Sequence, residues 1–239
     1  MPKNKPQLPK SRVAKLAESN LFPVFECAYP YRGPNGEDRA VKLRFRLLDM
    51  ATGKPPEDGR DTKTFEVKHK RGNYWRSGIG PYARTAIYNL PTATKAKAHG
   101  RTIYYTEGEK DASNAQRHWN VCAVAHYQGG TGATPEQARL LAGSRSRIVL
   151  VRDMDLVGAY VAWQNARALL AAGQPADKIT FARPALDFPK ADLSDHIEKG
   201  LGAKDLVEER PLEVAKLYDA YMELRAKSGR RRWMGSDAR

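Results

Sequence analysis

The chain has 239 residues, enough for one large domain or for two small ones with their own hydrophobic cores. Hydrophobic residues make up 41% of it, and no apolar run approaches the length of a transmembrane helix, which excludes a membrane-spanning protein. Residues 1–10 are basic and proline-rich and lack the apolar segment of a secretory signal. Cys27 and Cys122 are the only cysteines, too few for a four-cysteine zinc ribbon. We therefore expect a soluble cytoplasmic protein with two buried thiols.

The net charge of +14 is unevenly distributed along the chain. Residues 1–100 contain 20 Lys and Arg against 9 Asp and Glu, whereas residues 101–239 contain 21 against 18. A basic first part indicates a surface that binds a polyanion such as nucleic acid. A ribosomal or merely solubilising basic surface would give the same counts.

The first part of the chain is predicted to be a basic tail with a short helix at 11–19, followed by a basic β-rich subdomain over 21–98. Residues 41–47 alternate strictly between apolar and basic and read as a strand, with 49–60 as a loop and 64–68 as the antiparallel partner strand. Lys42, Arg44 and Arg46 then share one face, where they could follow a phosphate backbone. An ordinary solvated face is the alternative.

Aromatic and basic residues are mixed between residues 71 and 90. Rings beside cations suit unpaired bases and their phosphates, so Trp75, Arg76 and Arg84 are candidate DNA-binding residues. The nearby glycines Gly78 and Gly80 favour an exposed loop. Trp75 could equally belong to the core.

Short apolar strands alternate with helical patterns over residues 99–203. The predicted strands are 102–106, 121–125, 147–152 and 178–182, and the predicted helices are 110–118, 135–142, 158–172 and 193–199. This alternation predicts an α/β fold, a Rossmann-like parallel four-stranded sheet with flanking helices. Residues 204–239 read as a C-terminal helix and a basic tail.

Acidic residues follow three of these predicted strands. Because ligands bind at the carboxyl ends of parallel strands, the acids should gather at one edge of the sheet. Carboxylates so close repel one another unless a hard cation such as Mg²⁺ or Mn²⁺ lies among them. Helix capping, ion pairing or a strand-to-helix turn would explain any one group on its own. The residues expected to meet there are Glu107, Asp153, Asp155 and Asp192.

The order of these motifs resembles TOPRIM domains, which occur in DnaG-type primases, topoisomerases of types IA and II, OLD-family nucleases and RecR-like proteins. The matching segments are Glu-Gly-Glu-Lys-Asp at 107–111 and Asp-Met-Asp-Leu-Val-Gly at 153–158. The resemblance covers roughly residues 100–200. It implies that Glu107, Asp153 and Asp155 are the catalytic and metal-binding carboxylates, with Asp111, Asp192 and Asp195 as supporting metal ligands. The segment 128–132 resembles a flexible loop of these domains that could offer amides to phosphate, although a plain tight turn is equally consistent.

The basic β-rich segment before the TOPRIM-like region is similar to primases of phages and mobile elements. This resemblance implies synthesis of RNA primers from ribonucleoside triphosphates on a single-stranded DNA template, in a bacterial cell, with the template against the basic residues listed above. Lys110, Arg152 and Lys190 are candidate nucleotide-binding residues, or else solvated charges. With neither a zinc ribbon nor a P-loop motif, the chain is expected to work with a separate zinc-ribbon protein and a replicative helicase. The alternatives are a metal-dependent TOPRIM-type nuclease and a non-catalytic accessory protein that binds DNA and a helicase.

Overall fold

The computed structural model describes residues 6–234, with the backbone alone for 229–234. The chain forms two compact units, Met1–Ala83 and Arg84–Arg239. The predicted division after residue 98 therefore lies too late. Residues 84–98 belong to the second unit because Ile87, Leu90 and Ala93 are fully buried in its core. The outermost predicted tail segments, 1–5 and 235–239, lie outside the described residues.

The first unit is a four-stranded antiparallel sheet in the order β1-β2-β3-β4. Its strands are β1 (Leu21–Arg32), β2 (Asp38–Asp49), β3 (Lys63–Arg71) and β4 (Tyr74–Ser77). Helix α1 (Lys10–Glu18) precedes them, close to the predicted 11–19. A one-turn helix, η1 (Gly80–Tyr82), ends the unit. The apolar side of β2 packs in a small core around Leu43 and Phe45, which confirms the alternation seen in the sequence.

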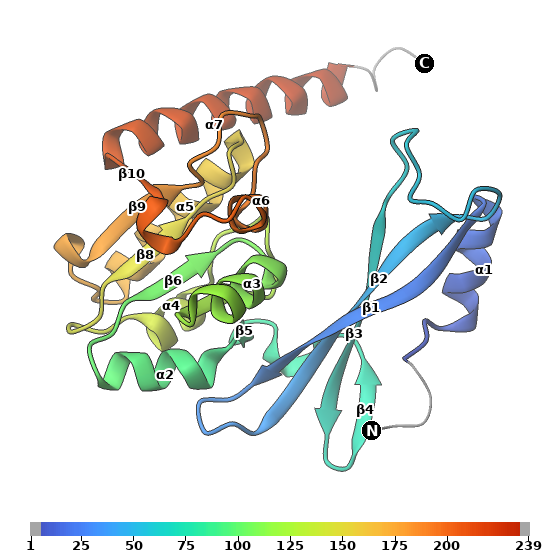
Figure 1. Cartoon of the computed structure of the whole chain (residues 1–239), viewed down its shortest axis with the longest axis horizontal. Coiled ribbons are helices and arrows are strands. Elements are labelled where there is room, and N and C mark those ends of the chain that lie inside the picture. Colours follow the sequence, from blue (N-terminus) through green and yellow to red (C-terminus); the bar gives the residue numbers. More distant parts are fainter. Residues whose placement is uncertain (1–5, 235–239) are drawn as a thin grey trace. The chain divides into compact units, whose positions relative to one another are not determined.

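The second unit is an α/β fold around a six-stranded sheet in the order β10-β9-β8-β6-β7-β5 (Figure 1). The four central strands are parallel, as predicted: β6 (Ile103–Thr106), β7 (Cys122–His126), β8 (Ile148–Val151) and β9 (Ile179–Arg183). Two short antiparallel strands, β5 (Ile87–Tyr88) and β10 (Val207–Glu209), add to the edges. The sequence analysis predicted neither of them.

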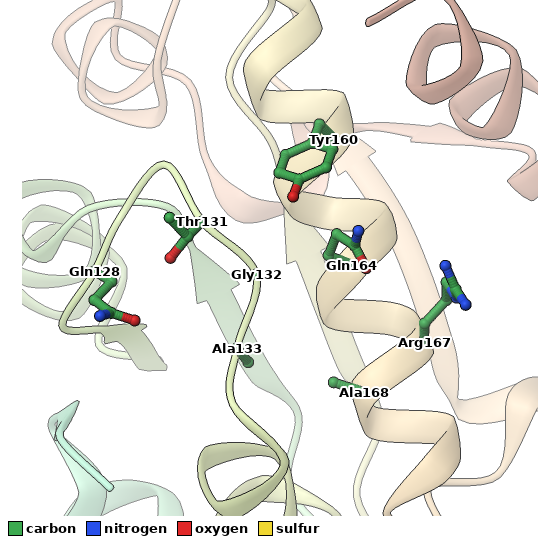
Figure 2. Close-up of a pocket in the computed structure, with 8 residues that line it drawn as sticks. All are labelled: Gln128, Thr131, Gly132, Ala133, Tyr160, Gln164, Arg167 and Ala168. Carbon is green, nitrogen blue, oxygen red and sulfur yellow. The ribbon is translucent and has the colours of Figure 1, made fainter. Parts of the chain in front are cut away.

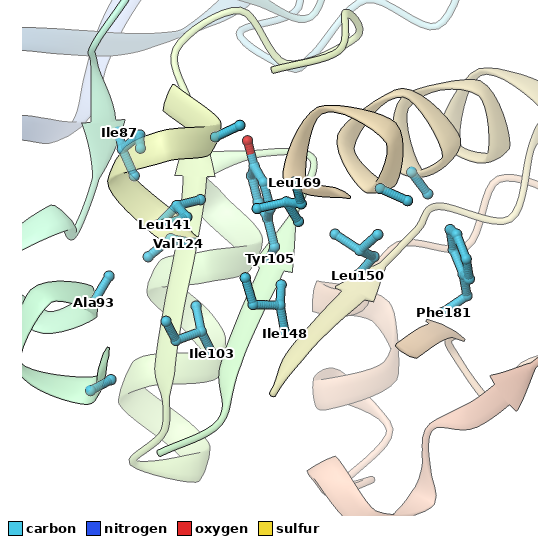
Figure 3. Close-up of a cluster of buried hydrophobic side chains, with 14 of the residues drawn as sticks. Ile87, Ala93, Ile103, Tyr105, Val124, Leu141, Ile148, Leu150, Leu169 and Phe181 are labelled. Carbon is cyan, nitrogen blue, oxygen red and sulfur yellow. The ribbon is translucent and has the colours of Figure 1, made fainter. Parts of the chain in front are cut away.

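Helices cover both faces of this sheet. They are α2 (Leu90–Ala98), α3 (Glu109–Trp119), α4 (Pro135–Leu141), α5 (Leu156–Ala171), α6 (Leu193–Glu198) and α7 (Pro211–Met234). Helices α3 and α6 pack together, while α4 and α7 both pack against α5. The core cluster lies between the strands and helices α2, α4 and α5, as Figure 3 shows. Single-turn helices η2 (Ala176–Lys178) and η3 (Ala203–Asp205) precede β9 and β10.

The buried strands explain why the parallel sheet could be predicted. Every residue of β8, Ile-Val-Leu-Val, is buried, as expected for a strand covered on both faces. Neither Cys27 nor Cys122 forms a disulfide, and both are only partly buried, so the expectation of two buried thiols is not met. None of the helices within residues 6–234 combines the length and the hydrophobicity needed to cross a lipid bilayer.

Candidate functional site

The sheet topology brings two of the acidic motifs to the same edge. Strands β6 and β8 are parallel neighbours, and Thr106 at the end of β6 pairs with Val151 at the end of β8. Glu107 directly follows β6, and Asp153 stands two residues beyond β8. The carboxyl ends of adjacent parallel strands therefore place these two acids beside one another.

Asp153 lies at the electrostatic centre of this edge. Burial and the negative charges of Glu107, Asp111, Asp192 and Asp155 together raise its pKa to about 8, with burial as the largest cause. The four acids come from the starts of α3, α5 and α6, which are far apart in sequence. The structure thus gathers these five predicted acids into one site, which we call the acidic centre.

Asp111 is fixed within the acidic centre by the start of α6. Its Oδ1 accepts hydrogen bonds from the Ser194 backbone N (3.1 Å) and from Ser194 Oγ (2.5 Å). Only 6% of Asp111 is exposed. Burial and then the charge of Asp192 raise the pKa of Asp111 to about 6. Asp111 therefore links α3 to α6 and also adds negative charge to the acidic centre. Its partner Ser194 is a site residue that the sequence analysis missed.

Three of the predicted acids also cap helices. Asp155 Oδ1 accepts from the Gly158 N at 2.7 Å at the start of α5. Asp192 and Asp195 form a reciprocal capping box at the start of α6, in which each carboxylate accepts the other's backbone N–H. Capping orients these carboxylates and uses one oxygen of each. The capping alternative that the sequence raised for Asp192 is therefore correct, and it coexists with the place of Asp192 at the acidic edge.

Backbone hydrogen bonds hold the second and third acidic motifs side by side. The Met154 N donates to the Ala191 O (2.9 Å), and the Lys190 N donates to the Met154 O (3.2 Å). Lys190 adopts a left-handed conformation with φ of 62°. Gly158 packs so closely on Asp153 that a Cβ there would lie 2.5 Å from the Asp153 carbonyl oxygen. The Asp-Met-Asp-Leu-Val-Gly segment is thus fixed from both sides, and the glycine is required for steric reasons.

The acidic centre has the right donors for a hard divalent cation. Within residues 6–234, no three Asp, Glu, His or Cys side chains are placed to hold one metal ion together. Mg²⁺ usually keeps several waters and takes only one or two protein carboxylates together with substrate phosphates. An open set of carboxylates around Asp153 fits that coordination, and it does not fit a closed structural site.

A glycine-rich loop, residues 127–133, lies against Glu107. A Cβ on Gly130 would lie 3.7 Å from Glu107 Oε1, and one on Gly129 would lie 3.8 Å from the Glu107 carbonyl oxygen. His126, fully buried at the end of β7, fixes this loop because its Nε2 lies 2.6 Å from the Thr131 O. Since a carbonyl can only accept, Nε2 carries the proton.

The other nitrogen of His126 contacts a second buried side chain. His126 Nδ1 lies 2.9 Å from the Tyr105 hydroxyl, and burial raises the pKa of Tyr105, which keeps it a neutral phenol. A neutral phenol can either donate its proton to Nδ1 or accept one from it. Sequence reasoning did not find this pair, and the only signal for it was a histidine at the end of a predicted strand.

The three candidate nucleotide-binding cations differ in their surroundings. Arg152 is only 7% exposed, and its Nε and Nη2 both donate to the Glu209 carboxylate at 2.7 Å. Instead of the predicted contact with a nucleotide, Arg152 forms a buried ion pair that joins β8 to β10. Lys110 Nζ lies 3.6 Å from Asp192 Oδ2, at the rim of the acidic centre. Lys190 is exposed next to it.

The predicted basic face of the first unit is partly neutralised. A β-bulge at Glu26 in β1 brings its carboxylate to Arg44, whose Nε lies 2.7 Å from Glu26 Oε2, and to Arg46 at 3.9 Å. Lys42 Nζ lies over the Phe65 ring, 4.6 Å from its centroid. Arg46 is the most exposed of the three. The row of free cations that the alternation suggested is therefore wrong for Arg44.

The β3–β4 hairpin presents the exposed aromatics of this unit. Tyr74 is 77% exposed and Trp75 is 45% exposed, and Arg76 beside them is exposed as well. Tyr88, by contrast, is buried in the second unit. Arg84 pairs with Glu136 at 2.8 Å, on the surface of the second unit. The open question about Trp75 is resolved in favour of an exposed ring.

Comparison with known proteins gives similarities at the level of structure alone. Neither a family model nor a curated protein matches the chain. A DnaG catalytic core structure covers 77% of this chain and 50% of its own, with 16% identity and a TM-score of 0.48. A DnaG primase catalytic domain bound to single-stranded DNA covers 74% and 47%, with 18% identity and a TM-score of 0.47. The E. coli primase catalytic core covers 83% and 58%, with 17% identity and a TM-score of 0.47. The chain thus spans about half the length of these solved chains.

Proposed function

We propose that the chain is a primase-type nucleotidyltransferase, which uses Mg²⁺ or Mn²⁺ to synthesise RNA primers on single-stranded DNA. The observation that carries the proposal is the acidic centre. Burial, and then the charges of four neighbouring carboxylates, raise the pKa of Asp153 to about 8 at the carboxyl edge of a parallel sheet. Such mutual repulsion costs stability in the absence of a cation and favours its uptake. The TOPRIM-like spacing of the same residues supports the assignment.

The residues of the acidic centre have separable roles in this proposal. Asp153 and Asp155 would hold the cation, and Glu107 would complete its site or accept the proton of the attacking 3′-hydroxyl through water. A cation held by these residues would supply positive charge to offset the negative charge that develops on the phosphate. Asp111 and Asp192 hold α3 and α6 in place and keep the centre negative. Lys110 and Lys190, at the rim, would pair with phosphates of a nucleotide.

The template would bind the basic first unit. Its exposed rings, Tyr74 and Trp75, stand beside Arg76 on the β3–β4 hairpin, which supports contact with unpaired bases and their phosphates. Arg46 adds a more exposed cation on β2.

The test is a product assay with labelled single-stranded DNA, ribonucleoside triphosphates and Mn²⁺. The proposal expects labelled RNA products, and it expects Glu107→Gln to reduce them about 100-fold or more. Glu198→Gln, an exposed acid at the end of α6, is the matched control and should retain activity. Shortening of the DNA instead of RNA synthesis would identify a nuclease. Binding of DNA with no product at all would identify an accessory protein.

A further inference from the structure

A groove of about 560 Å³ lies within the second unit, along α5 (Figure 2). On one side are residues one and two turns apart on the helix, Tyr160, Gln164, Arg167 and Ala168. On the other side is the glycine-rich loop, from Gln128 to Ala133. None of these residues belongs to the acidic centre.

Hydrogen-bonding groups and a positive charge dominate the polar lining of the groove. It contains a guanidinium, two side-chain amides, a threonine hydroxyl and a tyrosine hydroxyl, and it contains no carboxylate. Arg167 is exposed, and among the side chains of residues 6–228 its guanidinium has no ion pair or hydrogen bond. Tyr160 stacks on Tyr218 of α7 at 5.7 Å, so its ring is packed while its hydroxyl points toward the loop (Figure 2). Such a surface suits a ligand that offers many acceptor oxygens and negative charge.

The groove is built on fixed elements. The Ala133 N donates to Asn165 Oδ1 at 2.8 Å, which ties the end of the loop to α5. Gly132 packs directly on the helix, since a Cβ there would lie 2.5 Å from the Cβ of Gln164. His126 holds Thr131 from the other side. Both walls are therefore held in position before any ligand binds.

The loop that forms one wall of the groove also reaches the acidic centre. Gly130 in the same loop lies beside both Glu107 and Val157, and Asp155 caps the first turn of the helix that forms the opposite wall. Twelve residues separate Asp155 from Arg167, and this corresponds to about 18 Å along a helix axis. A nucleic-acid strand held at the acidic centre could extend along the groove over several nucleotides.

We propose that this groove binds the sugar-phosphate backbone of the strand whose phosphate is handled at the acidic centre. Arg167 pairs with a phosphate several nucleotides away from the reacting one. Gln128, Thr131, Gln164 and Tyr160 donate hydrogen bonds to backbone oxygens. Contacts of this kind are independent of sequence. The inference rests on the proposed function for the identity of the strand, and it adds a second, separate binding site.

The first test measures the binding of a fluorescein-labelled single-stranded oligonucleotide to the full chain by anisotropy, over a range of salt concentrations. Loss of one phosphate contact should reduce the slope of log K against log salt by about 0.7. We expect this reduction for Arg167→Gln. Arg101→Gln is the matched control, because Arg101 is exposed at the opposite end of β6, before the strand begins. Equal slopes for wild type and Arg167→Gln would overturn the proposal.

The second test places a photo-crosslinking residue, p-benzoylphenylalanine, at position 164 and, as a control, at position 101. We expect crosslinks to labelled single-stranded DNA or primer from position 164 only. Crosslinks to a second copy of the chain, or none to nucleic acid, would overturn the proposal. Crosslinking needs no catalysis, so the groove proposal and the proposed function can fail independently of each other. RNA synthesis without crosslinks rejects the groove, whereas crosslinks without RNA products reject the proposed function.

Discussion

At the scale of single residues, Asp153 combines a cost in stability with the functional role that we propose for it. It is surrounded by acids and partly buried, and both effects favour its neutral form. A group with a raised pKa in the folded state takes up a proton on folding. The stability associated with Asp153 is therefore present below the unfolded pKa and declines as pH rises toward about 8.

Replacing this carboxylate should therefore stabilise the metal-free protein in a pH-dependent way. In EDTA at about pH 8, Asp153→Asn should raise the free energy of unfolding by roughly 2–4 kcal/mol, with a much smaller gain near about pH 4, where the wild-type group is protonated in the folded state and about half protonated in the unfolded state. Urea unfolding at both pH values measures this difference. Asp219→Asn, an exposed acid on α7, is the control. An equal gain in stability at both pH values would contradict the raised pKa of Asp153.

The ion pair between Arg152 and Glu209 leads to a second expectation at this scale. Arg152→Met leaves the Glu209 carboxylate with Arg183 alone, 3.7 Å away, in a site where Glu209 is 9% exposed. Removing one partner of a buried pair costs about 3–5 kcal/mol. Chemical denaturation should show a loss of this size. A stable variant that had lost nucleotide binding instead would restore the role predicted from the sequence.

At the scale of elements, the parallel strands and most helices follow from the sequence pattern. Strands such as β8 are continuous apolar runs bounded by polar turns, which is a strong local signal. Helix α2, by contrast, buries Leu90, Ala93 and Ala96 but begins with Leu-Pro-Thr and carries little hydrophobic contrast. Strands β5 and β10 have two and three residues, too few for any periodicity. Packing against the rest of the unit decides these three elements.

The candidate site, too, was predictable from the sequence only in part. The acids could be predicted because the motif spacing and the strand ends are properties of the sequence. The hydrogen bonds of Ser194 to Asp111 and of Tyr105 to His126 join residues 83 and 21 positions apart, and no local pattern marks them. The neutralisation of Arg44 depends on a bulge at Glu26, which only the pairing of β1 with β2 reveals.

The β3–β4 hairpin gives a prediction at the same scale. Stacking of a base on an aromatic side chain contributes about 1–3 kcal/mol, so Trp75→Ala should weaken the binding of single-stranded DNA by about fivefold or more. Fluorescence anisotropy measures the change. Met50→Ala is the control, because Met50 is 54% exposed in the same unit and has no ring. Unchanged affinity of Trp75→Ala would move template binding away from the hairpin.

At the scale of the whole molecule, the observed boundary alters the charge distribution inferred from the sequence. Residues 1–83 contain 17 Lys and Arg against 9 Asp and Glu, and residues 84–239 contain 24 against 18. Both units are therefore basic, with surpluses of +8 and +6. The strong asymmetry at residue 100 arose partly because the division had been placed within the second unit.

Nucleic-acid binding by a chain of this charge should depend strongly on salt. Because each phosphate contact releases counterions, the affinity for single-stranded DNA should fall linearly on a log–log scale, with a slope of about −0.7 per contact. Titrations at several salt concentrations measure this slope. An affinity that stays constant with salt would show that the positive charge serves another purpose.

The two short edge strands of the second unit have a consequence for self-association. A long, uncovered border of a sheet offers a row of free amides and carbonyls on which another chain can assemble. Here β5 and β10 end the sheet with two and three residues, antiparallel to their neighbours. The second unit therefore offers little template for aggregation through strand addition, and its associations with other molecules are directed to its helices and loops.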